Sequence, residues 1–256
     1  WMGQQFIPFD KHLANDSAWA CRLPYTNREE QMHNITDCHA LGNGWVWNIP
    51  LWSRIGTGYC FSSRFISAEG AQMEFKEHLE ATYGKEIAEA ADMFHINIKH
   101  GYRRKAFVKN VVGIGLSYGF VEPLESTGLL TTHENILKLV DLINRRKGYI
   151  TNSEKEAYNF SVEYDLVGFR DFVSMHYALS MRTDTPYWRW ATQTNEYHPL
   201  QFNDFIPQYN VYTNLLVALQ SANTFQEANQ GANYIAAGMG INPYSTPETV
   251  HEEYSN

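Results

Sequence analysis

The sequence predicts an α+β protein, with strands in the first part of the chain and helices in the rest. Apolar and polar side chains alternate over residues 44–50, and apolar residues recur at helical spacing over 129–143. A capping-box pattern at Ser153 and Glu156 opens a further long helix that runs towards Arg182. We therefore expect a β-rich part over residues 1–128 and a mostly helical part over residues 129–256.

Residues 44–50, Gly-Trp-Val-Trp-Asn-Ile-Pro, predict the first clear strand. The alternation puts its two tryptophans and Ile49 on one face, and Pro50 limits pairing beyond that point. After a glycine-containing bend over 54–58, residues 59–66 predict the returning strand of a hairpin.

The next element is a helix over residues 68–83, with Phe75 and Leu79 one turn apart and Gly84 as its stop. A second hairpin is predicted from residues 94–99 and 105–110, turning at His100-Gly101. The apolar run over 111–115 lacks polar alternation, which is typical of a strand buried on both faces.

Helices follow. One stripe at helical spacing predicts a helix whose apolar face comprises Leu129, Leu130, His133, Ile136, Leu137, Val140 and Ile143. Beyond the long helix that follows it, we expect two more helical stretches, over residues 213–222 and 228–237.

The start of the helix after the glycine-rich segment is the part of the sequence that best fits a binding or catalytic site. A helix beginning near Ser126 leaves the backbone N–H groups of Ser126, Thr127 and Gly128 unpaired at the positive end of its dipole, which makes an anion site beside Glu125. The alternative is a plain cap, with Ser126 or Thr127 closing the helix and Glu125 favouring the dipole. From the residues alone we favour the cap, because capped helix starts far outnumber binding sites.

Other candidate residues also have structural interpretations. Trp45 and Trp47 are able to form a wall against a planar ligand, but such a strand face is more often core. His176 and Tyr177, inside the long helix, are expected to be packed residues, since no nucleophile motif accompanies them. The sequence contains neither an HExxH motif nor His and Cys at ligand spacing, so no metal site is expected.

Charge, hydropathy and cysteine content argue against some classes of binding partner and location. Lys and Arg number 20 against 28 Asp and Glu, a net charge of −8 that argues against nucleic acid as a partner. The longest mostly apolar stretch, around residues 111–121, is half the length of about 20 residues that a membrane helix needs, so no membrane span is expected. Three cysteines without a CxxC pair favour a reducing compartment, and we expect a cytoplasmic protein.

Three segments in order resemble the flavin-dependent tryptophan halogenases. Residues 45–50, Trp-Val-Trp-Asn-Ile-Pro, match the family's WxWxIP motif. Residues 109–128, which run from Lys-Asn-Val-Val-Gly-Ile-Gly to Glu-Pro-Leu-Glu-Ser-Thr-Gly, are similar to its second signature, and residues 182–189 look like a third shared stretch. The resemblance as a whole extends over nearly the whole chain.

The resemblance implies that the chain is the carboxyl-terminal half of such an enzyme. Family members carry a GxGxxG dinucleotide fold and a catalytic lysine in an amino-terminal half, and this sequence contains neither. It would thus be a fragment of a flavin monooxygenase-like α/β enzyme, with residues 1–128 as the β-rich part of the flavin and halide module and residues 129–256 as the substrate side. Such a chain is expected to be inactive alone.

The resemblance also implies a reaction and its residues. Reduced FAD, oxygen and a halide (chloride, bromide or iodide) give hypohalous acid, which halogenates an electron-rich ring of the tryptophan, indole or phenol type; a flavin reductase supplies the reduced flavin. Glu125 matches the active-site glutamate. The backbone at Ser126, Thr127 and Gly128 matches the halide site, and the residues near the flavin are Trp45, Trp47, Ile49 and Pro50.

Two other functions remain open at this point. One is a flavin-dependent aromatic hydroxylase, against which the two tryptophans and Glu125 argue. The other is a non-catalytic binding module derived from this half alone. The sequence leaves the substrate, the preferred halide and the oligomeric state open, a homo-oligomer included.

Overall fold

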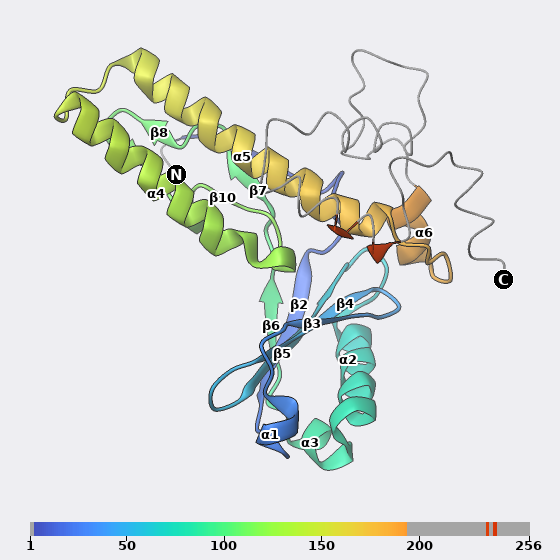
Figure 1. The fold of residues 1–256 in the computed structure, drawn as a ribbon. Helices are drawn as coiled ribbons and strands as arrows, with labels where there is room; N and C mark the ends of the chain where they lie inside the picture. Colours follow the sequence, from blue (N-terminus) through green and yellow to red (C-terminus); the bar gives the residue numbers. More distant parts are fainter. Residues whose placement is uncertain (1–2, 194–233, 236–237, 240–256) are drawn as a thin grey trace. The chain divides into compact units, whose positions relative to one another are not determined.

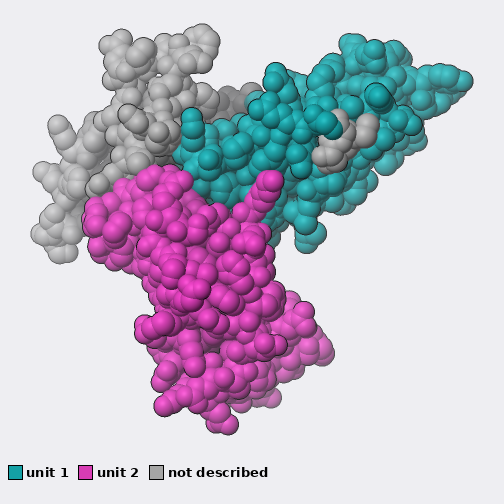
Figure 2. Space-filling model, turned by 180° about the vertical axis from the view of Figure 1, so that it is seen from behind, with its two compact units in different colours: residues 1–13, 100–181, 192–256 teal, residues 14–99, 182–191 magenta. Residues whose placement is uncertain are grey.

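The computed structural model describes residues 3–193, 234–235 and 238–239. The chain forms two compact units (Figure 2): residues 1–13, 100–181 and 192–256 form unit 1, and residues 14–99 and 182–191 form unit 2. Strands and helices are both present, as the expected α+β class requires. The functional division at residue 128 remains a prediction. Of the C-terminal helices expected over 213–222 and 228–237, only residues 234–235 lie within the described part.

Unit 2 is built on an antiparallel five-stranded sheet in the order β3-β4-β5-β2-β6 (Figure 1). The strands are β2 (Ser17–Leu23), β3 (Asp37–Ala40), β4 (Gly44–Pro50), β5 (Ile55–Phe61) and β6 (Phe94–Asn97). Its helices are α1 (Arg28–Gln31), α2 (Ala68–Tyr83) and α3 (Lys85–Ala90), and most of α6 (Pro186–Gln193) also belongs to this unit.

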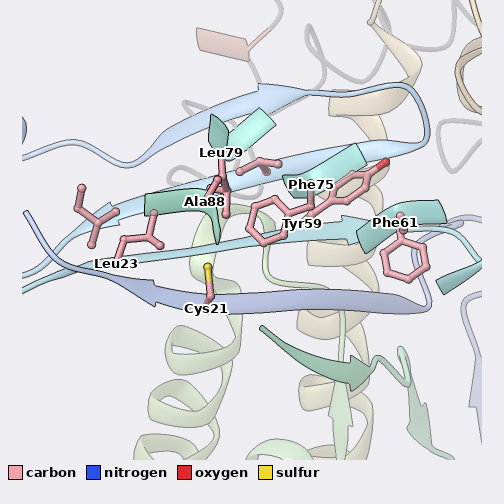
Figure 3. Packing of buried hydrophobic residues seen from close by; sticks show 10 residues of the cluster. Cys21, Leu23, Tyr59, Phe61, Phe75, Leu79 and Ala88 are labelled. Carbon is pink, nitrogen blue, oxygen red and sulfur yellow. The ribbon is translucent and has the colours of Figure 1, made fainter. Parts of the chain in front are cut away.

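The core of unit 2 lies between this sheet and α2 (Figure 3). Phe75 and Leu79, one helical turn apart, are fully buried against Tyr59 and Val46 of the sheet. The Ser67 side chain caps α2 by accepting from Gly70 N–H at 3.1 Å, and Gly84, at φ 91°, ends it. The predicted helix is confirmed at both ends.

The hairpin of β4 and β5 turns earlier than the sequence predicted. The turn occupies residues 51–54, closed by the Leu51 N–H donating to the Arg54 carbonyl at 2.8 Å, so β5 begins at Ile55 instead of residue 59. Gly58, expected in a bend, lies inside the strand opposite Trp47. A Cβ at Gly58 would lie 2.2 Å from the Trp47 ring, so the glycine makes room for a tryptophan and not for a turn.

Unit 1 contains two small antiparallel sheets and two long helices. One sheet has the order β1-β7-β10, from Phe6–Pro8, Gly101–Arg103 and Gly119–Phe120, and the other pairs β8 (Phe107–Val108) with β9 (Val111–Val112). The short helices η1 (Gly115–Ser117) and η2 (Leu124–Ser126) precede α4 (Thr127–Arg146) and α5 (Asn152–Ala178), which run side by side (Figure 1).

The second predicted hairpin is wrong. β6, in the first predicted arm, pairs with β2 in unit 2, and β8, in the second predicted arm, pairs with β9 in unit 1. The predicted turn itself contains a strand, β7, which pairs with β1 and β10. Gly101, at φ 136°, lets two backbones approach closely, because a Cβ there would lie 2.4 Å from the Ile7 carbonyl oxygen. The run over 111–115 is also not a buried strand: only two of its residues pair, and Val111 is 41% exposed.

The apolar stripe of α4 faces away from α5, the next helix in the chain. All seven stripe residues are exposed, and the buried residues of α4 are Thr127, Thr131, Asn135 and Leu142. Polar contacts join α4 to α5: the Tyr158 hydroxyl donates to the Asn135 carbonyl at 3.0 Å, and Lys138 contacts Asp165. The periodicity therefore predicted the helix correctly but not which face this chain covers.

The capping box of α5 lies two residues before the predicted one. The Thr151 hydroxyl accepts from Glu154 N–H, and the Glu154 carboxylate accepts from Thr151 N–H. The helix runs to Ala178, a little short of Arg182. Within the described residues, no helix is long and apolar enough to cross a lipid bilayer.

Candidate functional site

The turn before α4 holds two consecutive residues in the left-handed region. Glu125 has φ 63° and Ser126 has φ 53°, and neither is glycine. A left-handed residue with a side chain costs roughly 1–2 kcal/mol, because its Cβ approaches the following carbonyl oxygen. Such backbone conformations persist where surrounding contacts enforce them, and they gather at functional sites.

Two of the three predicted backbone donors lie in the first turn of α4. Ser126 N–H donates to the Pro123 carbonyl at 3.0 Å, so the expectation that this donor is free is wrong. Thr127 and Gly128 are the first two residues of α4, and N–H groups in the first turn of a helix have no acceptor within that helix. Ser126 makes no side-chain cap, which removes the plain-cap interpretation for that residue. An anion site here therefore depends on Thr127 and Gly128.

Packing fixes the position of these two donors. Thr127 is 3% exposed, and a Cβ at Gly128 would lie 3.3 Å from the Phe120 ring. The hydroxyls of Thr131 and Thr132 donate to carbonyls of this first turn, Thr131 to Thr127 at 3.0 Å and Thr132 to Gly128 at 2.7 Å. The helix start is consequently rigid, with its N–H groups held in one direction.

His176 of α5 holds the Glu125 side chain. Its Nε2 lies 3.0 Å from Glu125 Oε1, and its Nδ1 lies 2.9 Å from the Phe172 carbonyl oxygen. The hydrogen bond from His176 and the charge of its ring lower the pKa of the Glu125 carboxyl, although partial burial opposes them. Glu125 is thus a carboxylate at neutral pH, able to accept a proton.

The sequence interpretation missed this histidine. His176 and Tyr177 were expected to be packed residues: Tyr177 is buried with its hydroxyl donating to Glu122, and the His176 side chain is only 12% exposed, but its contact with Glu125 was not foreseen. His176 lies 51 residues after Glu125, and no local pattern links the two. Only its place in a helix that returns beside α4 brings them together, and that contact is not encoded in a motif.

The tryptophans of β4 occupy the sheet face opposite to the helix-covered core. Val46 lies in the core with α2, and alternation puts Trp45 and Trp47 on the other face, where their ring centroids lie 6.1 Å apart. Trp45 is 6% exposed and Trp47, Ile49 and Pro50 are half-buried. The expectation that this face is core is confirmed for Trp45, which is buried, although Trp45 lies outside the cluster that packs against α2.

One polar atom of that face lacks a partner. Within the described part of the chain, the Trp45 Nε1–H is buried and no acceptor contacts it. A buried unpaired donor costs about 1–3 kcal/mol, and it suits a planar ligand with acceptor atoms. The two groups of candidate residues lie in different units: Glu125, Ser126, Thr127 and Gly128 in unit 1, and Trp45, Trp47, Ile49 and Pro50 in unit 2.

Titratable groups close in sequence to the Glu125–His176 pair have partners of their own. Glu122 is fully buried and binds the Tyr177 hydroxyl. Burial raises the pKa of Asp171 to about 6, and the adjacent Arg170 guanidinium opposes that rise. Among the described residues, no three His, Cys, Asp or Glu side chains are grouped to hold a metal ion.

Comparison with known proteins identifies relatives of the whole chain. A family model described as tryptophan halogenase matches residues 1–253. Tryptophan 7-halogenase RebH of Lentzea aerocolonigenes is 36% identical over 190 residues, which are 73% of this chain and 34% of RebH. Tryptophan 6-halogenase SttH of Streptomyces toxytricini is 36% identical over 188 residues, 73% of this chain and 35% of SttH.

Solved structures share the fold. The apo structure of VirX1 superposes with a TM-score of 0.84 and 53% identity, covering 98% of this chain and 47% of VirX1. BrvH, a flavin-dependent halogenase from Brevundimonas sp. BAL3, gives a TM-score of 0.73 and 26% identity, covering 98% of this chain and 48% of BrvH. The chain therefore spans about half the length of these structures and about a third of the length of the curated relatives.

Proposed function

Because the chain belongs to the tryptophan halogenase family, we propose that it is the halide-site half of a flavin-dependent halogenase acting on an electron-rich aromatic ring. The observation that carries the proposal is the left-handed turn at Glu125 and Ser126, which leads directly into the first turn of α4 at Thr127 and Gly128. On this proposal the ring is of the tryptophan, indole or phenol type. The partners are the aromatic substrate and a flavin reductase.

The helix start binds the halide in this proposal. Thr127 and Gly128 present N–H donors at the positive end of α4, which attracts an anion without any cationic side chain. Ser126 contributes through the shape of the turn and not through its own N–H, which Pro123 already binds. Reduced FAD, when bound, supplies with oxygen the oxidising power that converts halide into hypohalous acid.

Glu125 acts on the substrate. Its Oε1 is held by His176, and its side chain is 40% exposed, so the second carboxylate oxygen is accessible. An ionised carboxylate in this position directs the electrophile to the ring and accepts the proton that the halogenated ring carbon releases. The proton count balances, because the ring loses one proton and the carboxylate gains it.

The tryptophan face of β4 is the flavin-proximal surface in this proposal. Trp45 and Trp47 offer flat apolar rings, and the unpaired Nε1–H of Trp45 offers a donor to a ring acceptor atom. Ile49 and Pro50, half-buried at the end of the strand, extend the same surface. An apolar wall of this kind keeps water from a reactive cofactor.

The test is a product screen with the complete enzyme. A panel of indoles, phenols and tryptophan is incubated with enzyme, FAD, NADH, a flavin reductase and either bromide or chloride, and products are identified by mass spectrometry. Halogenated product that depends on halide and on flavin reduction supports the proposal. Hydroxylated product alone would favour an aromatic hydroxylase, and a folded protein that turns over no ring would favour a binding module.

A further inference from the structure

The proton on the His176 ring can be located from its two neighbours. The Phe172 carbonyl at 2.9 Å from Nδ1 only accepts, so Nδ1 carries a hydrogen. A neutral ring in this tautomer would point the Nε2 lone pair at Glu125 Oε1, 3.0 Å away. That contact is a hydrogen bond only if one further proton lies between the two groups, and the ordinary arrangement is an imidazolium donating to a carboxylate.

The two partners differ in their exposure to solvent. The His176 side chain is 12% exposed and the Glu125 side chain 40%. The Phe172 ring packs edge-on against the imidazole, with centroids 4.9 Å apart. His176 is therefore the more buried side chain of the pair, and Glu125 is the more exposed to solvent. Among the described residues no group contacts Glu125 Oε2, so one oxygen is anchored and the other stays open.

The contact from His176 acts on Glu125, whose backbone is strained. Glu125 sits at φ 63°, in a region that a glutamate leaves readily when nothing holds it. Three side-chain angles and the backbone then decide where Oε2 points, and the contact to His176 fixes Oε1. Within the described part of the chain, His176 is the charged group that acts on Glu125: Glu122 binds Tyr177, Asp171 binds Arg170, and the first turn of α4 carries no charge.

We propose that His176 is the positioning residue for Glu125, donating from Nε2 to Oε1 so that Oε2 stays ionised and aimed to receive the proton released by the substrate ring. The inference rests on the proposed function of Glu125. His176 itself touches neither substrate nor cofactor. Its proton stays on Nε2 throughout, and the ring proton moves from carbon to Oε2 and then to solvent.

Two substitutions separate positioning from a merely structural role. His176→Gln keeps an N–H donor near the position of Nε2 but has no charge, and His176→Phe keeps a ring but no donor. We expect kcat for halogenation to fall roughly 100-fold in His176→Phe and by less than about 10-fold in His176→Gln, with KM for the substrate little changed. The acid limb of the rate profile should move to higher pH in both variants, because each loses the cation beside Glu125.

A second measurement does not depend on turnover. The Glu125 carboxyl carbon is titrated by NMR in wild type and in His176→Gln, which replaces the histidine by a residue of similar reach. The pKa of Glu125 should be higher in the variant. An unchanged Glu125 titration, or an acid limb that stays in place while both variants lose only thermal stability, would overturn the proposal.

The two readouts also distinguish this inference from the function it rests on. If Glu125→Gln halogenates normally while the Glu125 titration still depends on His176, the catalytic assignment of Glu125 fails and the pair is a structural contact. If Glu125→Gln is inactive and the titration is independent of His176, the function stands and the positioning role is overturned.

Discussion

The tryptophan strand and the Glu125 turn carry the two groups of candidate residues, and their geometry has different origins. In β4 the positions of Trp45 and Trp47 follow from strand alternation, and Gly58 on the neighbouring strand makes room for one ring. In the turn, Glu125 and Ser126 adopt backbone angles that their own side chains disfavour. The strand is thus set by local pattern, and the turn by contacts with residues far along the chain.

This difference predicts where substitutions act. Changes in the strand should affect stability first, because they disturb packing within one sheet. Changes in the turn should affect the reaction first, because the N–H groups in the first turn of α4 and the Glu125 carboxylate contribute little to the folded core.

The largest of the expected effects on the turn, short of removing Glu125 itself, concerns the backbone donor at Thr127. This residue has φ −61°, the value that proline fixes, and it is the first residue of α4, a position where proline is tolerated, so Thr127→Pro removes one N–H while keeping the φ of the residue itself. A hydrogen bond to an anion contributes about 1.5–3 kcal/mol, so the bromide concentration for half-maximal product formation should rise roughly 10-fold to 100-fold.

Thr127→Ala is the matched control for the proline variant, since it removes the side chain and keeps the N–H. Its bromide requirement should stay close to that of wild type, with folding of both variants checked by circular dichroism. Equal bromide dependence in the two folded variants would mean that the anion binds elsewhere.

A substitution in β5, next to the tryptophan strand, tests whether changes there affect stability first. In Gly58→Ala the new Cβ would lie 2.2 Å from the Trp47 ring and 2.7 Å from the Trp19 carbonyl oxygen. Overpacking of this kind should lower the free energy of unfolding by about 1–3 kcal/mol, measured by urea denaturation. Gly168→Ala in α5, where a Cβ meets nothing within 4 Å, is the control and should be neutral or stabilising. A Gly58→Ala protein as stable as wild type would show that Trp47 is loosely packed.

The smallest effect is a dependence of stability on pH through Glu125. Its pKa is lowered in the folded protein, so its contribution to stability is present above the unfolded value of 4.5 and is lost as the pH falls through the folded value. Because the carboxylate is partly exposed, solvent screens the interaction and the contribution is small. The difference in urea midpoint between wild type and Glu125→Gln should shrink from about pH 7 to about pH 3. A difference that grows on acidification would contradict the sign of this shift.

The sequence predicted local elements well where one pattern dominated. The strand over 44–50 and the helix over 68–83 are confirmed at their ends, because alternation, a serine cap and Gly84 all act within a few residues. The prediction of a bend at Gly58 is wrong, because a glycine that admits a tryptophan from the next strand looks the same in sequence as one in a turn. The hairpin predicted over 94–110 is wrong for a related reason, since β6 pairs with β2, β7 with β1 and β10, and β8 with β9, and none of the three pairs with another.

The candidate site was predictable only in part. The helix start at Thr127 follows from the sequence, but the left-handed angles of Glu125 and Ser126 do not, because neither residue favours them. The pairing of Ser126 N–H with Pro123 and of Glu125 with His176 depends on tertiary structure. The stripe of α4 shows the same limit: its apolar residues predict a helix, but the chain buries the threonine-bearing face.

The central claim is that the Glu125 turn performs chemistry and does not merely begin a helix. Glu125→Gln keeps the shape and the hydrogen-bonding capacity of the side chain and removes its charge, so it tests this claim most directly in the complete enzyme. We predict that halogenated product forms about 10²–10⁴-fold more slowly while the melting temperature and flavin binding stay near those of wild type. A variant that turns over at the wild-type rate, with only a small loss of melting temperature, would contradict the claim.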